Sequence, residues 1–337
     1  MKLYCGIDLH ANNSVVAVLD EGDSAVYEKR LPNDLSTIID VLRPYQADLT
    51  GCVVESTYNW YWLVDGLMEA GFPVHLAHTG AMPQYAGLKY TNDFSDARHL
   101  AHLLRLGILP TGYIYPKEER ALRDLLRRRL LLVRQKTLHH MSLQSMIARH
   151  SGQRLCANEI KALETKQLAD FLPPPILLGG QITHQARCWM DTAIKRIERE
   201  LQKRVQPRMD YQLLQSIPGV GPALGTTIAL ETGTIQRFSG PGNYASYARC
   251  VRSEKISNGK YKGQGNKKNG NKYLAWAFME AAHYGAIWNP QIKRYYQRKQ
   301  AKAHILVAKK AVANKLARAC YHMLKRGEMF DVTRAFG

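Results

Sequence analysis

The sequence has no paired cysteines and no long apolar run, and each absence excludes a class of protein. Its six cysteines are scattered without any Cys-x-x-Cys pair, so neither a zinc site nor a disulfide framework is predicted, and the thiols are expected to be reduced. No segment approaches the roughly 18 consecutive apolar residues that a membrane span needs, and no export signal opens the chain. We therefore expect an intracellular protein without a membrane partner.

Acidic residues become scarce after the first 80 positions. Residues 1–80 carry 11 acidic and 4 basic residues, whereas the rest of the chain carries 17 acidic and 43 basic residues, for a net charge of +19. Such an excess of positive charge indicates a polyanionic partner, and nucleic acid is the first candidate. The 337 residues, of which 45% are hydrophobic, suffice for at least two domains with their own cores.

Hydrophobic patterning predicts an α/β domain at the start of the chain. The predicted strands are Leu3–Leu9, Ser14–Leu19, Ala25–Leu31, Val53–Glu55 and Pro73–Ala77, and the predicted helices are Leu35–Leu42, Asn59–Ala70 and Ser95–Leu106. Asn33 or Asp34 is the expected cap of the first helix. The order βββαβαβα matches a ribonuclease H-like (RuvC-like) fold, since a doubly wound sheet would not begin with three consecutive strands.

The remainder of the chain is predicted to be mostly helical. A helix from Lys117 to about His150 and another from about Thr183 to Val205 predict a helical hairpin or coiled-coil arm, with a Pro/Gly-rich segment between them. The last third contains the turn Ile217–Pro222, a Gly/Asn/Lys-rich loop, and helices from Lys272 onward. The predicted domains are therefore 1–112, 113–206 and 207–337.

Four carboxylates are expected to meet in the first domain. Asp8 ends the first strand and Glu55 ends the fourth, and these strands are neighbours in a ribonuclease H-like sheet. Asp93 and Asp96 lie three residues apart at a helix start, so one helix face can present both. Such a cluster needs cations, and its oxygen ligands suit Mg²⁺, with Mn²⁺ as the alternative. Two ions about 4 Å apart would assist phosphoryl transfer.

A simpler interpretation makes Asp8 and Glu55 ordinary acids at strand ends, and Asp93 and Asp96 capping residues of a helix. Three histidines lie near these acids in the sequence, and a site for a hard cation does not require them: His10, His99 and His102.

Several short motifs together resemble a known family. They are Gly6-Ile7-Asp8, Glu55-Ser56-Thr57, Tyr90-Thr91-Asn92-Asp93 with Asp96-Ala97, the Ile217–Pro222 turn, and Tyr244-Ala245-Ser246-Tyr247-Ala248 followed by a Ser-x-Gly element. With these motifs almost the whole chain resembles the DEDD-type insertion-sequence transposases, bacterial enzymes with a RuvC-like nuclease domain and a serine-containing transposase domain. Studied members of that family are bridge-RNA-guided DNA recombinases.

The resemblance implies a set of roles. Asp8, Glu55, Asp93 and Asp96 would form the DEDD metal site, and a serine of the second domain would attack DNA and form a phosphoserine. Ser257 in Ser257-Asn258-Gly259 matches that serine, although its neighbours depart from the commoner Ser-Ser-Gly pattern and Ser253 lies four residues upstream. The resemblance also implies donor and target DNA, a guide RNA, a homo-oligomer between dimer and tetramer, and a cytoplasmic, nucleoid-associated location.

The residues around Ser257 carry the charge that a phosphate needs. Arg249 to Lys272 holds eight basic residues and one acid, and its glycines let the backbone approach a phosphate. The residues predicted to bind nucleic acid are Arg249, Arg252, Lys255, Lys260, Lys262, Lys267, Lys268 and Lys272, with Gly219 and Gly221 of a turn that resembles a helix-hairpin-helix. A solvated loop with an unreactive serine, and a plain tight turn between packed helices, are the alternatives.

Three functions remain open from the sequence. The first is a Mg²⁺-dependent, RNA-guided transposase that acts as a serine recombinase. The second is a metal-dependent RuvC-like resolvase or nuclease that uses water as the nucleophile. The third is a non-catalytic nucleic-acid-binding protein, whose binding would be sensitive to salt.

Overall fold

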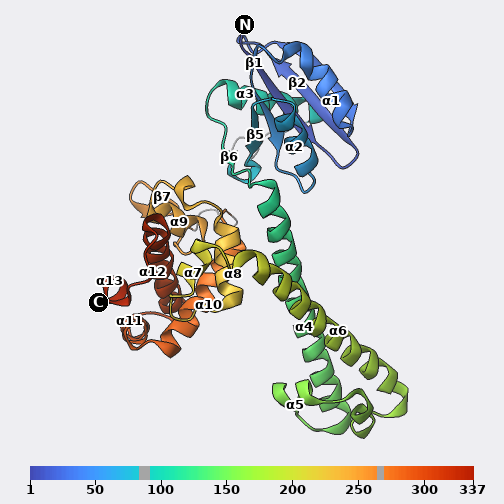
Figure 1. Cartoon of the computed structure of the whole chain (residues 1–337), viewed down its shortest axis with the longest axis vertical. Helices are drawn as coiled ribbons and strands as arrows, with labels where there is room; N and C mark the ends of the chain where they lie inside the picture. The colour runs from blue at the N-terminus through green and yellow to red at the C-terminus, as the bar shows by residue number, and fades with distance from the viewer. Residues whose placement is uncertain (83–91, 264–268) are drawn as a thin grey trace. The chain divides into compact units, whose positions relative to one another are not determined.

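The beginning of the chain folds into a six-stranded mixed sheet with the order β3-β2-β1-β4-β5-β6 (Figure 1). The strands are β1 (Leu3–Leu9), β2 (Asn13–Leu19), β3 (Ala25–Pro32), β4 (Leu49–Glu55), β5 (Val74–Ala77) and β6 (Thr111–Gly112). The first three are antiparallel, while β4 runs parallel to β1 and β5 parallel to β4. The five predicted strands are confirmed. The sixth, an antiparallel neighbour of β5, was not predicted because two residues carry no readable alternation.

The computed structural model describes residues 1–82, 92–263 and 269–337. Four residues of the predicted motifs therefore lie outside the described residues: Tyr90, Thr91, Lys267 and Lys268. The chain divides into two units, Met1–Lys117 and Glu118–Gly337, and each has its own apolar core. Within the described part of the chain, no helix is long and apolar enough to cross a membrane.

Helices cover both faces of the sheet in the first unit. The side chains of Cys5 and Ile7 in β1 belong to the core cluster that α1 (Leu35–Leu42) and α2 (Tyr61–Glu69) close. Tyr4, on the opposite face of β1, packs with Ala101 of α3 (Asp93–Arg105). Because successive side chains of a strand alternate between faces, Gly6 and Asp8 share the face that α3 covers. Both faces of the sheet are shielded from water at β1 and β2, which explains why these strands are almost entirely apolar.

A pair of long helices, α4 (Lys117–Ser151) and α6 (Pro174–Val205), forms the arm of the second unit. Between them lie the short helices α5 (Ala157–Ala162) and η4 (Thr165–Asp170). The ion pairs Arg129–Glu198 and Lys136–Asp191 connect the long helices.

The predicted start of the second arm helix at Thr183 was wrong, because α6 begins nine residues earlier at Pro174. Prolines are tolerated in the first helical turn, whose N–H groups have no partner within the helix. Gly180 lies inside the helix, where a Cβ would come within 2.3 Å of Leu172 Cδ1, so the glycine allows close packing. The Pro/Gly-rich segment therefore contains a helix start and a packing contact.

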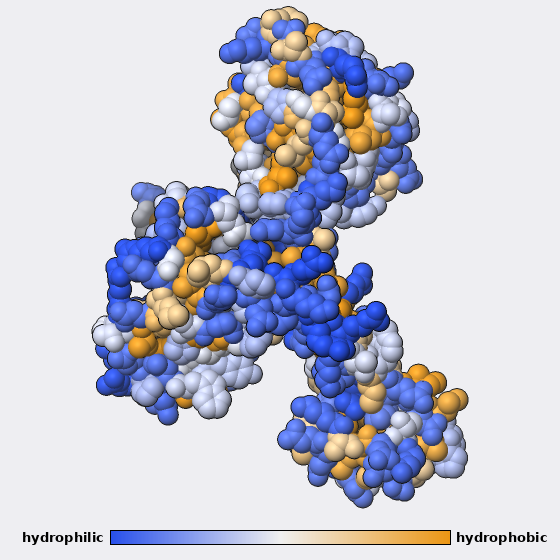
Figure 2. Space-filling view, viewed as in Figure 1, coloured by the Kyte–Doolittle hydropathy of each residue, from blue (hydrophilic) through white to orange (hydrophobic). Residues whose placement is uncertain are grey.

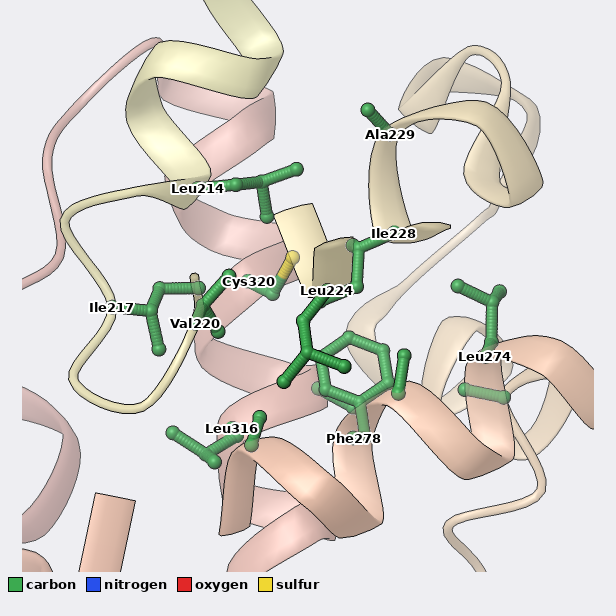
Figure 3. Packing of buried hydrophobic residues seen from close by; sticks show 14 of the residues in the cluster. Leu214, Ile217, Val220, Leu224, Ile228, Ala229, Leu274, Phe278, Leu316 and Cys320 are labelled. Carbon is green, nitrogen blue, oxygen red and sulfur yellow. The ribbon is translucent and has the colours of Figure 1, made fainter. Parts of the chain in front are cut away.

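The rest of the second unit is a bundle around one core (Figure 3). Its helices are α7 (Met209–Leu214), α8 (Pro222–Thr232), η5 (Ile235–Arg237), α9 (Pro241–Tyr247), α10 (Lys272–Trp288), α11 (Pro290–Gln300), α12 (Ile305–Arg326) and α13 (Val332–Phe336). Leu224 and Ile228 of α8 pack against Phe278 of α10, close to Leu316 and Cys320 of α12. This core holds in place the loop between α9 and α10, which contains the predicted serine.

Candidate active site and serine hairpin

Three side chains of the first unit converge at the end of β1. His10 Nε2 lies 3.2 Å from Asp8 Oδ2 and 3.4 Å from Asp93 Oδ2. One ligand atom from each of these residues fits within a group whose members are all within 4.8 Å of one another. Asp8 is buried and has only 3% of its surface exposed. A metal ion could therefore take ligands from two carboxylates and an imidazole that come from β1, the following turn and α3.

Glu55 and Asp96 complete the predicted set of acids around Asp8. Burial raises the pKa of Glu55 to about 8, together with a hydrogen bond to Asp8 and the negative charges of Asp8 and Asp96. Burial and the charges of Asp8 and Asp93 also raise the pKa of Asp96. Carboxyl groups that raise one another's pKa share a small volume without enough positive charge. The structure thus brings all four predicted acids together.

Asp93 is the acid of this group that already has a cation beside it. Arg30 of β3 donates a hydrogen bond to Asp93 Oδ2. This bond, with the charges of His10 and Arg30, holds the pKa of Asp93 below its ordinary value despite some desolvation. Asp93 is therefore ionised at neutral pH, whereas Glu55 can keep a proton on its carboxyl group.

His10 is the member of the group that the sequence interpretation set aside. Its backbone carbonyl accepts hydrogen bonds from Asn33 Nδ2 at 2.9 Å and Asn59 Nδ2 at 3.0 Å, and these fix the turn after β1. The sequence does contain a signal for His10, because a residue two places after Asp8 in an extended chain lies on the same face as Asp8. Asn33 thus holds this turn, and Asp34 is the cap of α1.

The interpretation of Asp93 and Asp96 as helix caps was wrong. Asn92 caps α3: its side chain accepts from Ser95 N at 2.8 Å, and Ser95 Oγ accepts from Asn92 N at 2.9 Å. Asp93 and Asp96 lie in the first turn, where negative charge also complements the helix dipole. Their carboxylates are therefore not needed for capping and can face Asp8.

In the second unit, Ser257 lies at the tip of a two-stranded hairpin formed by β7 (Ile256–Ser257) and β8 (Lys260–Tyr261). Asn258 and Gly259 have φ angles of 49° and 68°, the left-handed pair that a two-residue hairpin turn requires. Ser257 is exposed and faces Lys260 across the hairpin, and the bonds between Lys255 and Lys262 or Gly263 extend the pairing. The described part of the predicted loop therefore contains a paired hairpin, with Ser253 outside its two strands.

Comparison with known proteins decides the family. A model of the DEDD transposases of IS110, described as "Transposase", matches residues 5–151, and a model described as "Transposase IS116/IS110/IS902 family" matches residues 211–297. The chain belongs to the IS110 family of transposases. It is 24% identical to the "Transposase for insertion sequence element IS1328" of Yersinia enterocolitica, over 97% of this chain and 98% of that protein. It is 23% identical to a "Probable family 20 transposase" of Pseudomonas aeruginosa, over 85% and 87%.

As a member of this family the transposase is an enzyme that cleaves DNA and transfers its strands. Its acid cluster fits a divalent cation, because Glu55 and Asp96 have raised pKa values that a nearby cation would relieve. Oxygen ligands from carboxylates with one imidazole are a donor set that divalent metals accept.

The basic residues around the hairpin of the transposase divide into two groups. Arg249 closes the base of the loop, since its Nε donates to the backbone oxygens of Asn269 and Gly270 at 3.1 and 3.0 Å. The others are exposed: Arg252, Lys255, Lys260, Lys262 and Lys272. Arg252 also pairs with Glu254 at 3.1 Å. We call residues 249–263 and 269–271, the described part of this segment, the serine loop.

The glycines of the predicted phosphate-binding turn have different surroundings. Gly219 has a φ of 88° and packs on α10, where a Cβ would come within 2.3 Å of the backbone nitrogen of Gly285. Gly221 is the N-cap of α8 and has nothing near its Cβ position. The turn therefore contacts α10 at Gly219, whereas Gly221 has free space at its Cβ position.

Gly6 lets α3 approach β1 closely enough to bring the acids together. A Cβ on Gly6 would lie 2.0 Å from the carbonyl oxygen of Ala97 and 2.8 Å from the nitrogen of Ala101, so Gly6→Ala must push the helix away. We expect a loss of about 2–3 kcal/mol in the free energy of unfolding, measured by urea denaturation, and weaker Mn²⁺ binding in calorimetry. Gly112→Ala is the control, because its nearest contact is an ordinary 3.5 Å. Unchanged Mn²⁺ affinity in Gly6→Ala would contradict this account.

The raised pKa of Glu55 predicts how the stability of the metal-free transposase depends on pH. The carboxyl has a pKa of about 8 in the folded chain against an ordinary 4.5, so between these values the folded state binds more protons than the unfolded state. The free energy of unfolding therefore falls as the pH rises from about 5 to 8. We expect a loss of about 2 kcal/mol, less than the full shift implies, because Glu55 is partly exposed and water screens its charge.

This pH dependence can be isolated with Glu55→Gln. Urea denaturation in a chelator, repeated across the pH range, should give a flatter profile for the variant than for the wild type. Histidines such as His99 titrate in both proteins, so the difference between the profiles belongs to Glu55. Two parallel profiles would show that Glu55 does not hold a proton in the folded chain.

Proposed function

We propose that this transposase is a Mg²⁺-dependent, RNA-guided recombinase that cuts and rejoins donor and target DNA through a phosphoserine at Ser257. The observation that carries the proposal is the exposed serine at the tip of a paired basic hairpin, in a chain that also has a cluster of four acids. A hydroxyl at the end of a hairpin can reach a DNA backbone while the hairpin's own strands stay paired. Mn²⁺ is the alternative cation.

The first unit would act as a ribonuclease H-like, RuvC-like nuclease domain. Asp8, Glu55, Asp93 and Asp96 would hold the metal, and His10 would contribute a further ligand or orient Asp8. When bound, the cation supplies positive charge at the phosphate under attack. In its absence Arg30 and His10 provide the positive charge beside Asp93, and the raised pKa of Glu55 keeps a proton on that carboxyl group.

The second unit would carry out the covalent step. The Ser257 hydroxyl loses its proton and attacks phosphorus, a serine–phosphate bond forms, and the bond from phosphorus to one sugar oxygen breaks, with that oxygen taking a proton. No bond energy is lost to water, so the same steps in reverse rejoin DNA. Lys260, opposite Ser257, and the nearby Lys255 and Lys262 supply positive charge for the phosphate as negative charge develops on it.

Guide RNA and an assembly of two to four copies belong to the same proposal. Basic side chains extend far beyond the hairpin, since Lys293 to Arg326 holds eleven basic residues and no acid. Figure 2 shows hydrophilic residues spread over much of the exposed surface of the arm and of the C-terminal helices. A surface of this extent can hold more than one nucleic-acid strand.

A metal-dependent nuclease that uses water is the second candidate. It is favoured by the acid cluster, whose members all lie within the first unit. Such an enzyme would cleave DNA without any covalent intermediate and would not need Ser257.

The deciding experiment combines the protein with Mg²⁺, end-labelled donor DNA and RNA transcribed from the flanks of its element. The products are separated on a denaturing gel, and peptide mapping locates any attached DNA. A labelled adduct that requires metal, RNA and Ser257 is the expected result. Cleavage without an adduct would establish the water-using nuclease, and binding without cleavage or adduct would contradict the proposal.

A further inference from the structure

A fully buried carboxylate, Glu231 of α8, connects the arm to the helical bundle. Its Oε1 accepts a hydrogen bond from Arg127 Nε at 2.7 Å, and its Oε2 accepts from Arg127 Nη2 at 2.9 Å and Arg123 Nη2 at 3.1 Å. Both arginines belong to α4. Burial by itself would raise the pKa of Glu231, but these hydrogen bonds and charges hold it below its ordinary value, so the group is ionised at neutral pH.

The same carboxylate also holds the end of the serine loop. Asn271 Nδ2 donates to Glu231 Oε2 at 2.7 Å, while Asn271 Oδ1 accepts from the backbone nitrogens of Tyr273 and Leu274 and caps α10. The backbone nitrogen of Asn271 donates to the carbonyl of Tyr247 at 2.6 Å, which brings the two ends of the loop together. Glu231 therefore contacts the residue at which the loop closes.

A buried ion pair of this kind is a poor source of stability, because the cost of desolvating the charges offsets much of their attraction. Its geometry is nevertheless restrictive, since four hydrogen bonds converge on the carboxylate, one on Oε1 and three on Oε2. A shift of α4 relative to α8 must therefore either break these bonds or move Asn271. The network therefore couples the position of α4 to the position of the base of the serine loop.

We infer that Glu231 is a positioning residue for the serine chemistry, because it ties the place of the serine loop to α4 through Arg123, Arg127 and Asn271. A displacement of α4 relative to α8 would then change where the hairpin presents Ser257. This inference rests on the proposed function of Ser257.

The test uses Asn271→Ser in the full chain. Serine is also a good N-cap, so α10 keeps its start, but the side chain is too short to reach Glu231. At saturating DNA we expect the rate of adduct formation to fall by about 100-fold, the loss typical of a catalytic group misplaced by an ångström. The DNA affinity should stay unchanged. Hydrogen exchange should become faster at residues 249–263 and 269–271 and stay unchanged in α12.

Glu198→Gln is the matched control, because it breaks another α4 ion pair, with Arg129, that makes no hydrogen bond or ion pair with the described residues of the serine loop. It should leave both adduct rate and loop exchange at wild-type values. A wild-type rate and wild-type loop exchange in Asn271→Ser would overturn the inference, as would faster exchange throughout the second unit, which indicates a general loss of stability. If Ser257→Ala still forms the adduct, the proposed function fails, and the exchange comparison still decides whether Glu231 positions the loop.

Discussion

Ser257→Ala is expected to abolish the covalent protein–DNA adduct and to reduce recombination by at least about 1,000-fold, because alanine has no oxygen that can attack phosphorus. The fold should not change. Ser257 is exposed, and the turn depends on the left-handed conformations of Asn258 and Gly259, so the free energy of unfolding should stay within about 0.5 kcal/mol of the wild type. The measurements are the denaturing gel with labelled DNA, a DNA-binding titration and urea denaturation.

Ser253→Ala is the matched control, four residues away and outside the paired strands of the hairpin. It should form the adduct at the wild-type rate. An adduct that persists in Ser257→Ala and disappears in Ser253→Ala would transfer the nucleophile to Ser253. An adduct that persists in both variants would show that neither Ser257 nor Ser253 is the nucleophile.

Asp8→Asn should have an equally large effect on metal-dependent cleavage, with a loss of at least about 1,000-fold. Asn has nearly the same shape, but it removes the negative charge closest to the centre of the acid cluster. Mn²⁺ binding in calorimetry should be lost as well. The free energy of unfolding of the metal-free protein should not fall, because the substitution removes a buried charge that repels Asp96.

Asp40→Asn, an exposed acid on α1, is the control and should bind Mn²⁺ and cleave DNA normally. If Asp8→Asn bound Mn²⁺ with wild-type affinity, the metal site would have to lie elsewhere. If it bound no metal but cleaved DNA, the acids would not take part in the chemistry.

The strands and the acid cluster could be predicted from the sequence, because both depend on local patterns. A run of apolar residues set the ends of β1 to the residue, and helical patterning after a capping residue set those of α1; the positions of Asp8 and Glu55 at the ends of neighbouring strands followed from the strand order. The catalytic roles of these acids remain predictions.

Other features depend on contacts between distant segments or on competing local signals. The contacts of Glu231 with Arg123 and Asn271 join residues 108 and 40 positions apart, and no periodicity in the sequence indicates such pairs. The start of α6 was missed because Pro174 and Gly180 usually mark a linker, and here a helix uses both. His10 was set aside on ligand chemistry, although its position two residues after Asp8 placed it on the correct face.

The division of the chain at Lys117 and Glu118 has a consequence for the order of synthesis. A ribosome completes the acids of the first unit, of which Asp96 is the last, well before it adds Ser257. Domains of a growing chain generally fold from the N-terminus onward. Under the proposed function, a nascent transposase would thus acquire its metal ligands first and its nucleophile later.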